Sequence, residues 1–175
     1  MRPLALSLTI FGVLLRLLPH PPNFAPVGGT SLYAGARLRG WQAYLIPLAI
    51  MLITDPLLGA IHGFSPFSWM TPVIYGCFLI SVWLGRYLRA TESVGRIAAT
   101  TFLGSLQFFA ITNFVVWLRG SMYSHDLAGL ATCFTAALPF FGRTVAADLF
   151  FAGLLFTLHA WLSRRAFPAE VAVAV

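Results

Sequence analysis

The sequence predicts an all-α integral membrane protein, a bundle of six transmembrane helices. Of its 175 residues, 59% are hydrophobic and only 9% are charged, whereas soluble domains carry about 25% charged residues. So few charges cannot cover a water-facing surface. The apolar residues form long unbroken runs rather than the short alternating segments of a transmembrane β-barrel, so the spans are expected to be helices. The length leaves room for a single transmembrane domain, residues 1–175, and for no separate soluble catalytic domain.

Six apolar segments are assigned as helices in chain order. They cover residues 4–18, 25–37, 41–58, 71–88, 97–118 and 140–162. The first ends at a proline cluster, Pro19, Pro21 and Pro22, because proline interrupts a helix. No small-residue cleavage site follows this segment, so it is interpreted as a retained helix and not as a signal peptide.

Two of the later assignments depend on small residues and proline. Residues 25–37 are rich in glycine, alanine and serine, which suits close helix packing better than contact with lipid. This segment is also short for crossing the hydrocarbon core of a membrane. Residues 126–138 are expected to form a short re-entrant or interfacial helix that stops at Pro139.

The arginines predict the orientation of the bundle. All 11 basic residues are arginine, standing singly or in pairs between apolar runs; this pattern is typical of loop anchors and excludes a nucleic-acid-binding surface. Both termini are predicted to be cytoplasmic, because cytoplasmic loops carry the excess of arginine. Eight arginines then lie inside: Arg2, Arg37, Arg39, Arg86, Arg89, Arg96, Arg164 and Arg165. The outer side keeps Arg16, Arg119 and Arg143.

With this orientation, the other polar side chains gather at the outer side. Ionisable groups inside a membrane are costly, so they usually face a cavity or one another. A substrate-binding pocket that opens to the outside is therefore predicted. Its candidate residues are His20, Asn23, Asp55, Asn113, Tyr123, Arg143 and Asp148.

Several of these residues also have a purely structural interpretation. Asp55 precedes Pro56 and can cap backbone groups that this proline leaves free. Arg143 and Asp148 can pair with groups on neighbouring helices. The four histidines form no i,i+4 pair on a helix, so each is more typical of an interface than of a metal site.

The two cysteines, Cys77 and Cys133, form neither a CxxC pair nor a disulfide framework. A free cysteine in an apolar helix usually acts as a small hydrophobic residue. Next to Gly76, at the depth of the predicted pocket, the thiol of Cys77 can also act as a soft ligand to a metal-containing solute. Cys133 is the other candidate.

Several stretches resemble a family of small bacterial membrane proteins described mainly as transporters. Within that group the chain is similar to the BtuM type, a solitary substrate-binding (S) component of energy-coupling-factor (ECF) transporters. The resemblance covers most of the chain, and the proline-rich first loop is its most specific part. The stretches are 16–28 (RLLPHPPNFAPVG), 31–36 (SLYAGA), 52–55 (LITD), 113–117 (NFVVW), 129–133 (GLATC) and 138–141 (LPFF).

This resemblance implies uptake of cobalamin (vitamin B12) across the bacterial inner membrane by a six-helix, multi-pass protein. It also implies a cysteine that ligates the cobalt of cobalamin, and its position gives that role to Cys77, with Cys133 as the alternative. Such a bond is expected to promote loss of the upper axial ligand of cobalt. The expected partner is an ECF energising module, a transmembrane coupling subunit plus ATPases. S components commonly dock that module through small residues spaced by four on the first helix; here the nearest equivalent is Ser31-xxx-Gly35 on the second.

Other function classes have less support in the sequence. No GxxxxGK[ST] motif is present, so ATP-driven transport needs partner chains. A small integral membrane enzyme is an alternative, although the chain contains neither a GxSxG elbow nor an HExxH pair. An S component for a different solute is the other alternative, because only the resemblance, and no residue pattern, points to cobalamin.

Overall fold

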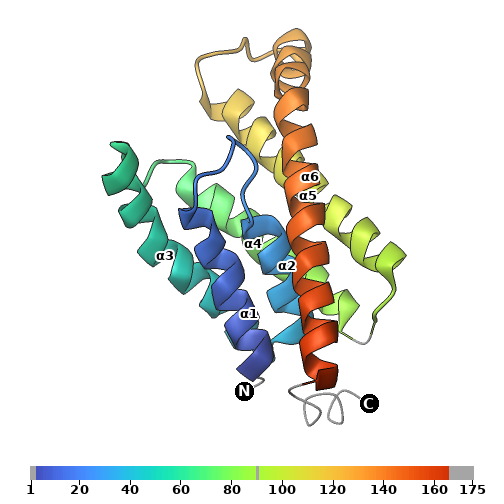
Figure 1. Cartoon of the computed structure of the whole chain (residues 1–175). Helices are drawn as coiled ribbons and strands as arrows, with labels where there is room; N and C mark the ends of the chain where they lie inside the picture. The colour runs from blue at the N-terminus through green and yellow to red at the C-terminus, as the bar shows by residue number, and fades with distance from the viewer. Residues whose placement is uncertain (1–2, 90, 166–175) are drawn as a thin grey trace.

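The structure is a computed structural model that describes residues 3–89 and 91–165. Six α-helices form one bundle in this part of the chain (Figure 1), which confirms the all-α class and the number of helices. They are α1 Pro3–Leu14, α2 Val27–Arg37, α3 Gln42–His62, α4 Thr71–Gly85, α5 Val94–Arg119 and α6 Leu127–Arg165. Two single-turn 3-10 helices, η1 Leu15–Leu17 and η2 Arg86–Leu88, extend α1 and α4.

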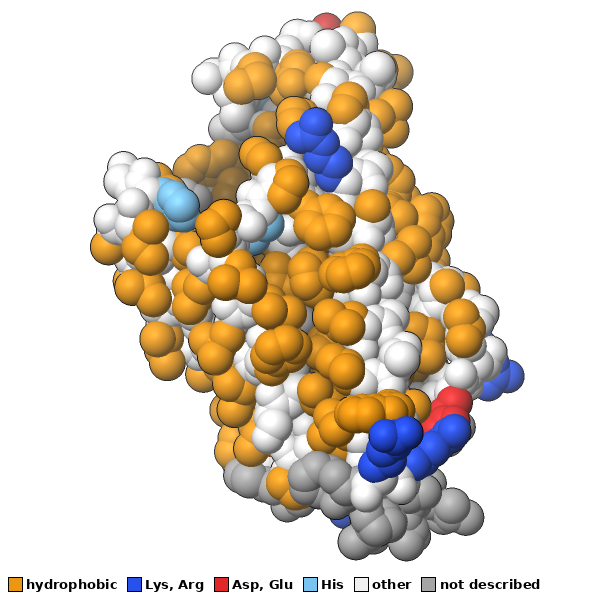
Figure 2. All heavy atoms as spheres, viewed as in Figure 1, with side chains coloured by type: hydrophobic (Ala, Val, Ile, Leu, Met, Phe, Trp, Pro, Cys, Tyr) orange, Lys and Arg blue, Asp and Glu red, His pale blue; other side chains and the backbone are white. Residues whose placement is uncertain are grey.

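Four of the helices are long and apolar enough to cross a membrane: α3, α4 with η2, α5 and α6. The apolar helix Pro3–Leu17 is shorter. On the face shown in Figure 2, hydrophobic side chains cover most of the bundle. A multi-pass membrane protein therefore agrees with the structure, while the side of the membrane that each end faces stays a prediction.

The longest helix differs from its predicted form. Residues 126–138 do not form a separate re-entrant or interfacial helix; residues 127–138 belong to α6, which runs for 39 residues and contains Pro139. The predicted start near residue 140 is therefore wrong, because Pro139 does not end the helix. A proline inside a membrane helix removes one backbone hydrogen bond, but neighbouring helices can keep the helix continuous. The third predicted helix is also longer, since α3 ends at His62, before Gly63 with φ 71°.

Helix α2 lies at the centre of the bundle and packs against α1, α3, α4 and α6. All of its residues except Gly28 are buried. Its backbone touches that of α4: a Cβ on Gly35 would collide with the carbonyl oxygen of Val82, and a Cβ on Gly85 with that of Leu32. Small residues thus allow two backbones to approach closely, as predicted for residues 25–37.

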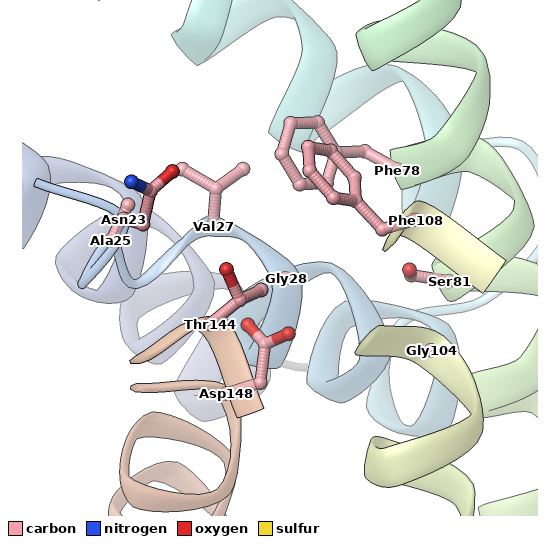
Figure 3. A pocket seen from close by; sticks show the side chains of 10 residues that line it. All are labelled: Asn23, Ala25, Val27, Gly28, Phe78, Ser81, Gly104, Phe108, Thr144 and Asp148. Atoms are coloured by element: carbon pink, nitrogen blue, oxygen red, sulfur yellow. The ribbon is translucent and has the colours of Figure 1, made fainter. Parts of the chain in front are cut away.

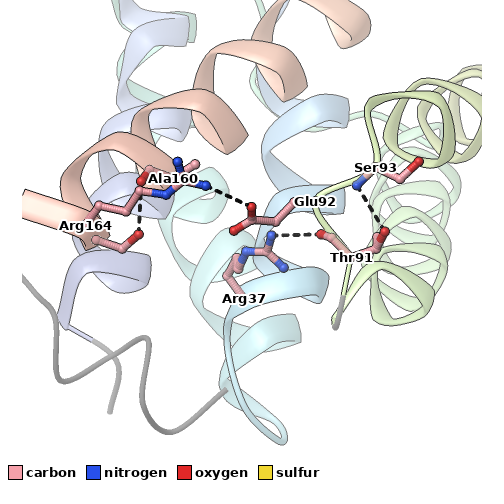
Figure 4. A network of polar contacts seen from close by, with 7 residues as sticks. Arg37, Thr91, Glu92, Ser93, Ala160 and Arg164 are labelled. Carbon is pink, nitrogen blue, oxygen red and sulfur yellow. Dashed lines mark hydrogen bonds and ion pairs between the residues drawn. The ribbon is translucent and has the colours of Figure 1, made fainter. Parts of the chain in front are cut away.

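The two ends of the bundle carry different groups. We call the end where α1 begins and α6 ends the basic end; Arg37 there donates to the carbonyl oxygens of Leu88, at 3.0 Å, and Thr91, at 3.2 Å. Arg164 pairs with Glu92 at 3.2 Å (Figure 4). We call the opposite end the loop end, because the connections 18–26, 63–70 and 120–126 lie there (Figure 1).

Candidate functional site

A cavity of about 110 Å³ lies where α2 begins, between α4, α5 and α6 (Figure 3). A second cavity of about 240 Å³ lies between α5 and α6 and shares Asn23, Phe108 and Thr144 with the first. We call them the α2 cavity and the α5–α6 cavity. Main wall residues of the α2 cavity are Phe78 and Ser81 of α4, Gly104 and Phe108 of α5, and Thr144 and Asp148 of α6.

Among the residues that the structure describes, Asp148 is the only ionisable one that lines the α2 cavity. It lies near the middle of α6 with only 5% of its surface exposed. Its Oδ1 accepts a hydrogen bond from the backbone N–H of Gly29 at 3.0 Å, and its Oδ2 accepts one from the Ser105 hydroxyl at 2.7 Å. It forms no ion pair with any residue that the structure describes.

The position of Gly29 explains how a carboxylate is tolerated there. Gly29 lies in the first turn of α2, where backbone N–H groups have no partner within the helix and the helix dipole favours negative charge. Gly28 keeps the approach open, because a Cβ at this position would collide with the Asp148 carboxylate. The start of α2, and not a basic side chain, therefore stabilises Asp148.

Aromatic rings and a strained asparagine complete the walls. The rings of Phe78 and Phe108 stack with their centroids 5.5 Å apart, and Figure 3 shows them on the side of the cavity away from Thr144 and Asp148. Asn23 has φ 63°, a left-handed conformation that asparagine tolerates better than most residues. It brings the proline-rich segment 18–26 to the rim of both cavities.

A second polar cluster ties η1, α3 and α4 together towards the loop end. Arg16 forms an ion pair with Asp55 at 2.6 Å and donates to the Thr54 hydroxyl at 3.0 Å. The Tyr75 hydroxyl donates a short hydrogen bond to the other carboxylate oxygen of Asp55. Asp55 therefore has side-chain partners on two other elements, and these contacts favour a structural role.

The two cysteines are both buried. Cys77 is 1% exposed, and its backbone carbonyl accepts from the Gln107 amide at 3.0 Å. It does not line either of the two cavities, although its neighbour Phe78 does. The thiol of Cys133 donates to the carbonyl oxygen of Asn113 at 3.5 Å. Within residues 3–89 and 91–165, no three His, Cys, Asp or Glu side chains are grouped to hold a metal ion.

The structure brings three of the predicted binding residues to the cavities: Asn23, Asn113 and Asp148. Of the other four, Asp55 lies in the cluster with Arg16. The remaining three, which line neither cavity, are His20 and Arg143, both exposed, and Tyr123, half-buried in the connection 120–126.

Sequence reasoning missed the residues that hold Asp148 and face it. Ser105 and Gly29 are its hydrogen-bond donors, and Phe78 and Phe108 form the aromatic wall. The pair Gly28-Gly29 at the start of a small-residue helix was a usable signal, because a helix N-terminus without side chains favours an anion. The phenylalanines carry no such signal, since 16 of them are spread along the chain.

Three comparisons with known proteins bear on the identity of the chain. Neither the curated proteins nor the solved structures give a match. A family model, described as a family of unknown function (DUF6580), matches residues 2–170. Because this match spans nearly the whole sequence, the chain belongs to the DUF6580 family.

Proposed function

We propose that this chain is the solute-binding subunit of a membrane uptake system, of the S-component kind. The observation that carries the proposal is Asp148, a buried carboxylate that lines a cavity inside an apolar bundle. Ionisable groups in such a position usually mark a substrate or ion pathway. The energy for uptake comes from partner chains of an ECF-type module, since the sequence has no phosphate-binding loop.

In this proposal the loop end faces the outside and the basic end faces the cytoplasm of a bacterium. The arginine distribution supports this orientation, because seven arginines flank helix ends at the basic end. They are Arg37, Arg39, Arg86, Arg89, Arg96, Arg164 and Arg165. A reporter fused after residue 175 tests it: a fluorescent protein is expected to be active there and a periplasmic phosphatase inactive. The opposite result would reverse the bundle and place the cavities' nearest loops in the cytoplasm.

Cobalamin is the first candidate solute, because of the resemblance to the BtuM type. The Cys77 thiolate is then the axial ligand of cobalt. Since Cys77 is buried beside Phe78, cobalt reaches the sulfur only if α4 moves away from its neighbours. Because Phe78 stacks on Phe108 of α5, such a movement of α4 away from α5 would separate these two rings.

The test is an absorption spectrum of the purified full-length chain after incubation with cobalamin. Wild type is expected to retain the corrin with shifted bands, and Cys77→Ala to retain it without the shift. Cys133→Ala is the matched control, since Cys133 is buried to a similar degree. A shift lost only in Cys133→Ala would move the ligand to that cysteine. A chain that retains no corrin would exclude cobalamin as the solute.

A smaller solute is the second candidate, favoured by the size of the cavities. Sites for drug-sized ligands have volumes of about 300–1,000 Å³, and the two cavities here measure about 110 and 240 Å³. A corrin with its side chains is larger than a drug-sized ligand. Without movement of the helices, these cavities suit a compact molecule better than cobalamin.

A further inference from the structure

The electrostatic balance of the α2 cavity is the starting point. Within residues 3–89 and 91–165, Asp148 is the one ionisable group on its wall, and the other polar side chains there, Asn23, Ser81 and Thr144, are neutral. The start of α2 supplies only about half of a positive charge to an adjoining anion. An ionised Asp148 therefore leaves the cavity with a negative potential, which the surrounding apolar helices do not screen.

The hydrogen bonds of Asp148 also leave room for a ligand. An ionised carboxylate has about four acceptor sites, two on each oxygen. Here Oδ1 accepts one bond, from Gly29, and Oδ2 accepts one, from Ser105. Each oxygen thus keeps an acceptor site for a donor that enters the cavity, and a positively charged donor gains most from it.

The opposite wall suits an apolar or aromatic group. Phe78 and Phe108 present ring surface to the cavity, and aromatic rings pack well against one another. A molecule with a charged amine and an apolar or aromatic body would place the amine at Asp148. Its body would lie along the rings and extend into the α5–α6 cavity, whose wall also includes Phe109 and Phe140.

We infer that the α2 cavity selects small organic cations, molecules in which an ammonium group is attached to an apolar or aromatic body. This inference rests on the proposed solute-binding function and specifies the solute class of the same cavity. Asp148 recognises the ammonium group, and Phe78 with Phe108 recognises the body. A corrin is not required for this recognition.

The inference is tested with three probes of similar size and shape and different charge. They are 2-phenylethylamine, which is a cation at neutral pH, 2-phenylethanol, which is neutral, and 3-phenylpropanoate, which is an anion. Binding to the purified full-length chain is measured by calorimetry at pH 7. We expect the amine to bind at least tenfold more tightly than the alcohol, and the carboxylate to bind more weakly than both.

Two variants connect this selectivity to Asp148. Asp148→Asn, which keeps an oxygen for the Gly29 N–H, is expected to lower the affinity for the amine at least tenfold and to leave the alcohol within about twofold. Asp126→Asn, which removes an exposed carboxylate outside the cavities, is the matched control and is expected to change neither.

The results separate this inference from the function on which it rests. Equal affinities for the three probes would overturn the charge selectivity and leave a solute-binding chain. Amine binding that is unchanged in Asp148→Asn would overturn the assigned residue. If wild type binds none of the probes and yet retains cobalamin, the inference fails while the uptake function stands. The first and third of these results are measured on wild type alone, so they do not depend on how well Asp148→Asn folds.

Discussion

The two halves of the bundle differ in the size of the side chains that lie between their helices. Towards the basic end, α2 and α4 touch backbone to backbone, because Gly35 and Gly85 have no side chains. Towards the loop end, Gly29 brings α2 close to the backbone of α6, but phenylalanines such as Phe78, Phe108 and Phe109 line two cavities. We call the half in which glycines close the contact between α2 and α4 the closed half, and the half that contains the cavities the open half.

The two halves also differ in how their buried charged residues, Arg37 and Asp148, are bonded. Arg37, in the closed half, donates to three backbone carbonyls, those of Leu88, Arg89 and Thr91, and its guanidinium lies over the ring of Phe156. Asp148, in the open half, accepts only two hydrogen bonds and faces a cavity. A charge surrounded by the fold's own groups is structural, whereas one that retains bonding capacity beside a cavity is available to a ligand.

The largest effect is expected where the backbones touch. Gly85→Ala should lower the free energy of unfolding by about 3 kcal/mol, because the new Cβ forces α2 and α4 apart. Gly76→Ala, on the same helix, meets no atom within 4 Å and should not lower stability, because alanine is the better helix former by about 0.5–1 kcal/mol. Thermal unfolding of the chain in detergent measures both. Equal losses would mean that close packing does not distinguish the two halves.

The ion pair towards the loop end should come second. Arg16→Ala leaves the Asp55 carboxylate without its cation. Because the Asp55 side chain is only 12% exposed, the free energy of unfolding should fall by about 2 kcal/mol, between the values for surface and buried ion pairs. The double variant Arg16→Leu/Asp55→Leu should recover most of this loss, since it removes both charges. If the double variant were as unstable as the single one, the cluster would be stabilised by something other than charge pairing.

A smaller effect on stability is expected at Asp148. Asp148→Asn should cost about 1 kcal/mol, because an amide oxygen can still accept the Gly29 N–H. Arg37→Met should cost more, since it removes the guanidinium that donates to the carbonyl oxygens of Leu88, Arg89 and Thr91. Chemical unfolding of both variants under the same conditions shows which one loses more stability. A larger loss in Asp148→Asn than in Arg37→Met would mean that Asp148 has a structural role.

The smallest effect concerns the beginning of α6. The backbone N–H of Gly129 and then the hydroxyl of Ser124 donate to Asp126, and these bonds lower the pKa of its carboxyl. A lowered pKa in the folded state contributes stability above the ordinary aspartate value of about 3.9, and this contribution is lost as the pH falls through the folded-state value. Asp126→Asn should therefore melt slightly below wild type at pH 7, and thermal melts at decreasing pH should show this difference shrinking once the pH is below the ordinary aspartate value.

The part of this structure that could be predicted from the sequence follows from local patterns. Long apolar runs predicted the helices, and the costly placement of Asp148 in one of them predicted a cavity residue. The contact with Gly29 could not be predicted, because 119 positions separate the two residues. Nor does a nearly uniform apolar helix such as α4 indicate which of its sides carries Cys77 and which carries the cavity. The effect of Pro139 could not be predicted either, because neighbouring helices decide whether a helix continues through a proline.

The shortness of α2 constrains how the ribosome and the membrane insertion machinery build this protein. Eleven residues extend about 16 Å, roughly half of the hydrocarbon thickness, and the segment includes the buried polar residues Thr30, Ser31 and Arg37. Such a segment cannot partition into lipid by itself. Its packing partners on α4 and α6 are translated later, so α2 can reach its buried position only after those helices have been made. A nascent chain that stops before α6 would leave the polar residues of α2 without their packing partners. Membrane quality-control proteases would be expected to degrade such a chain.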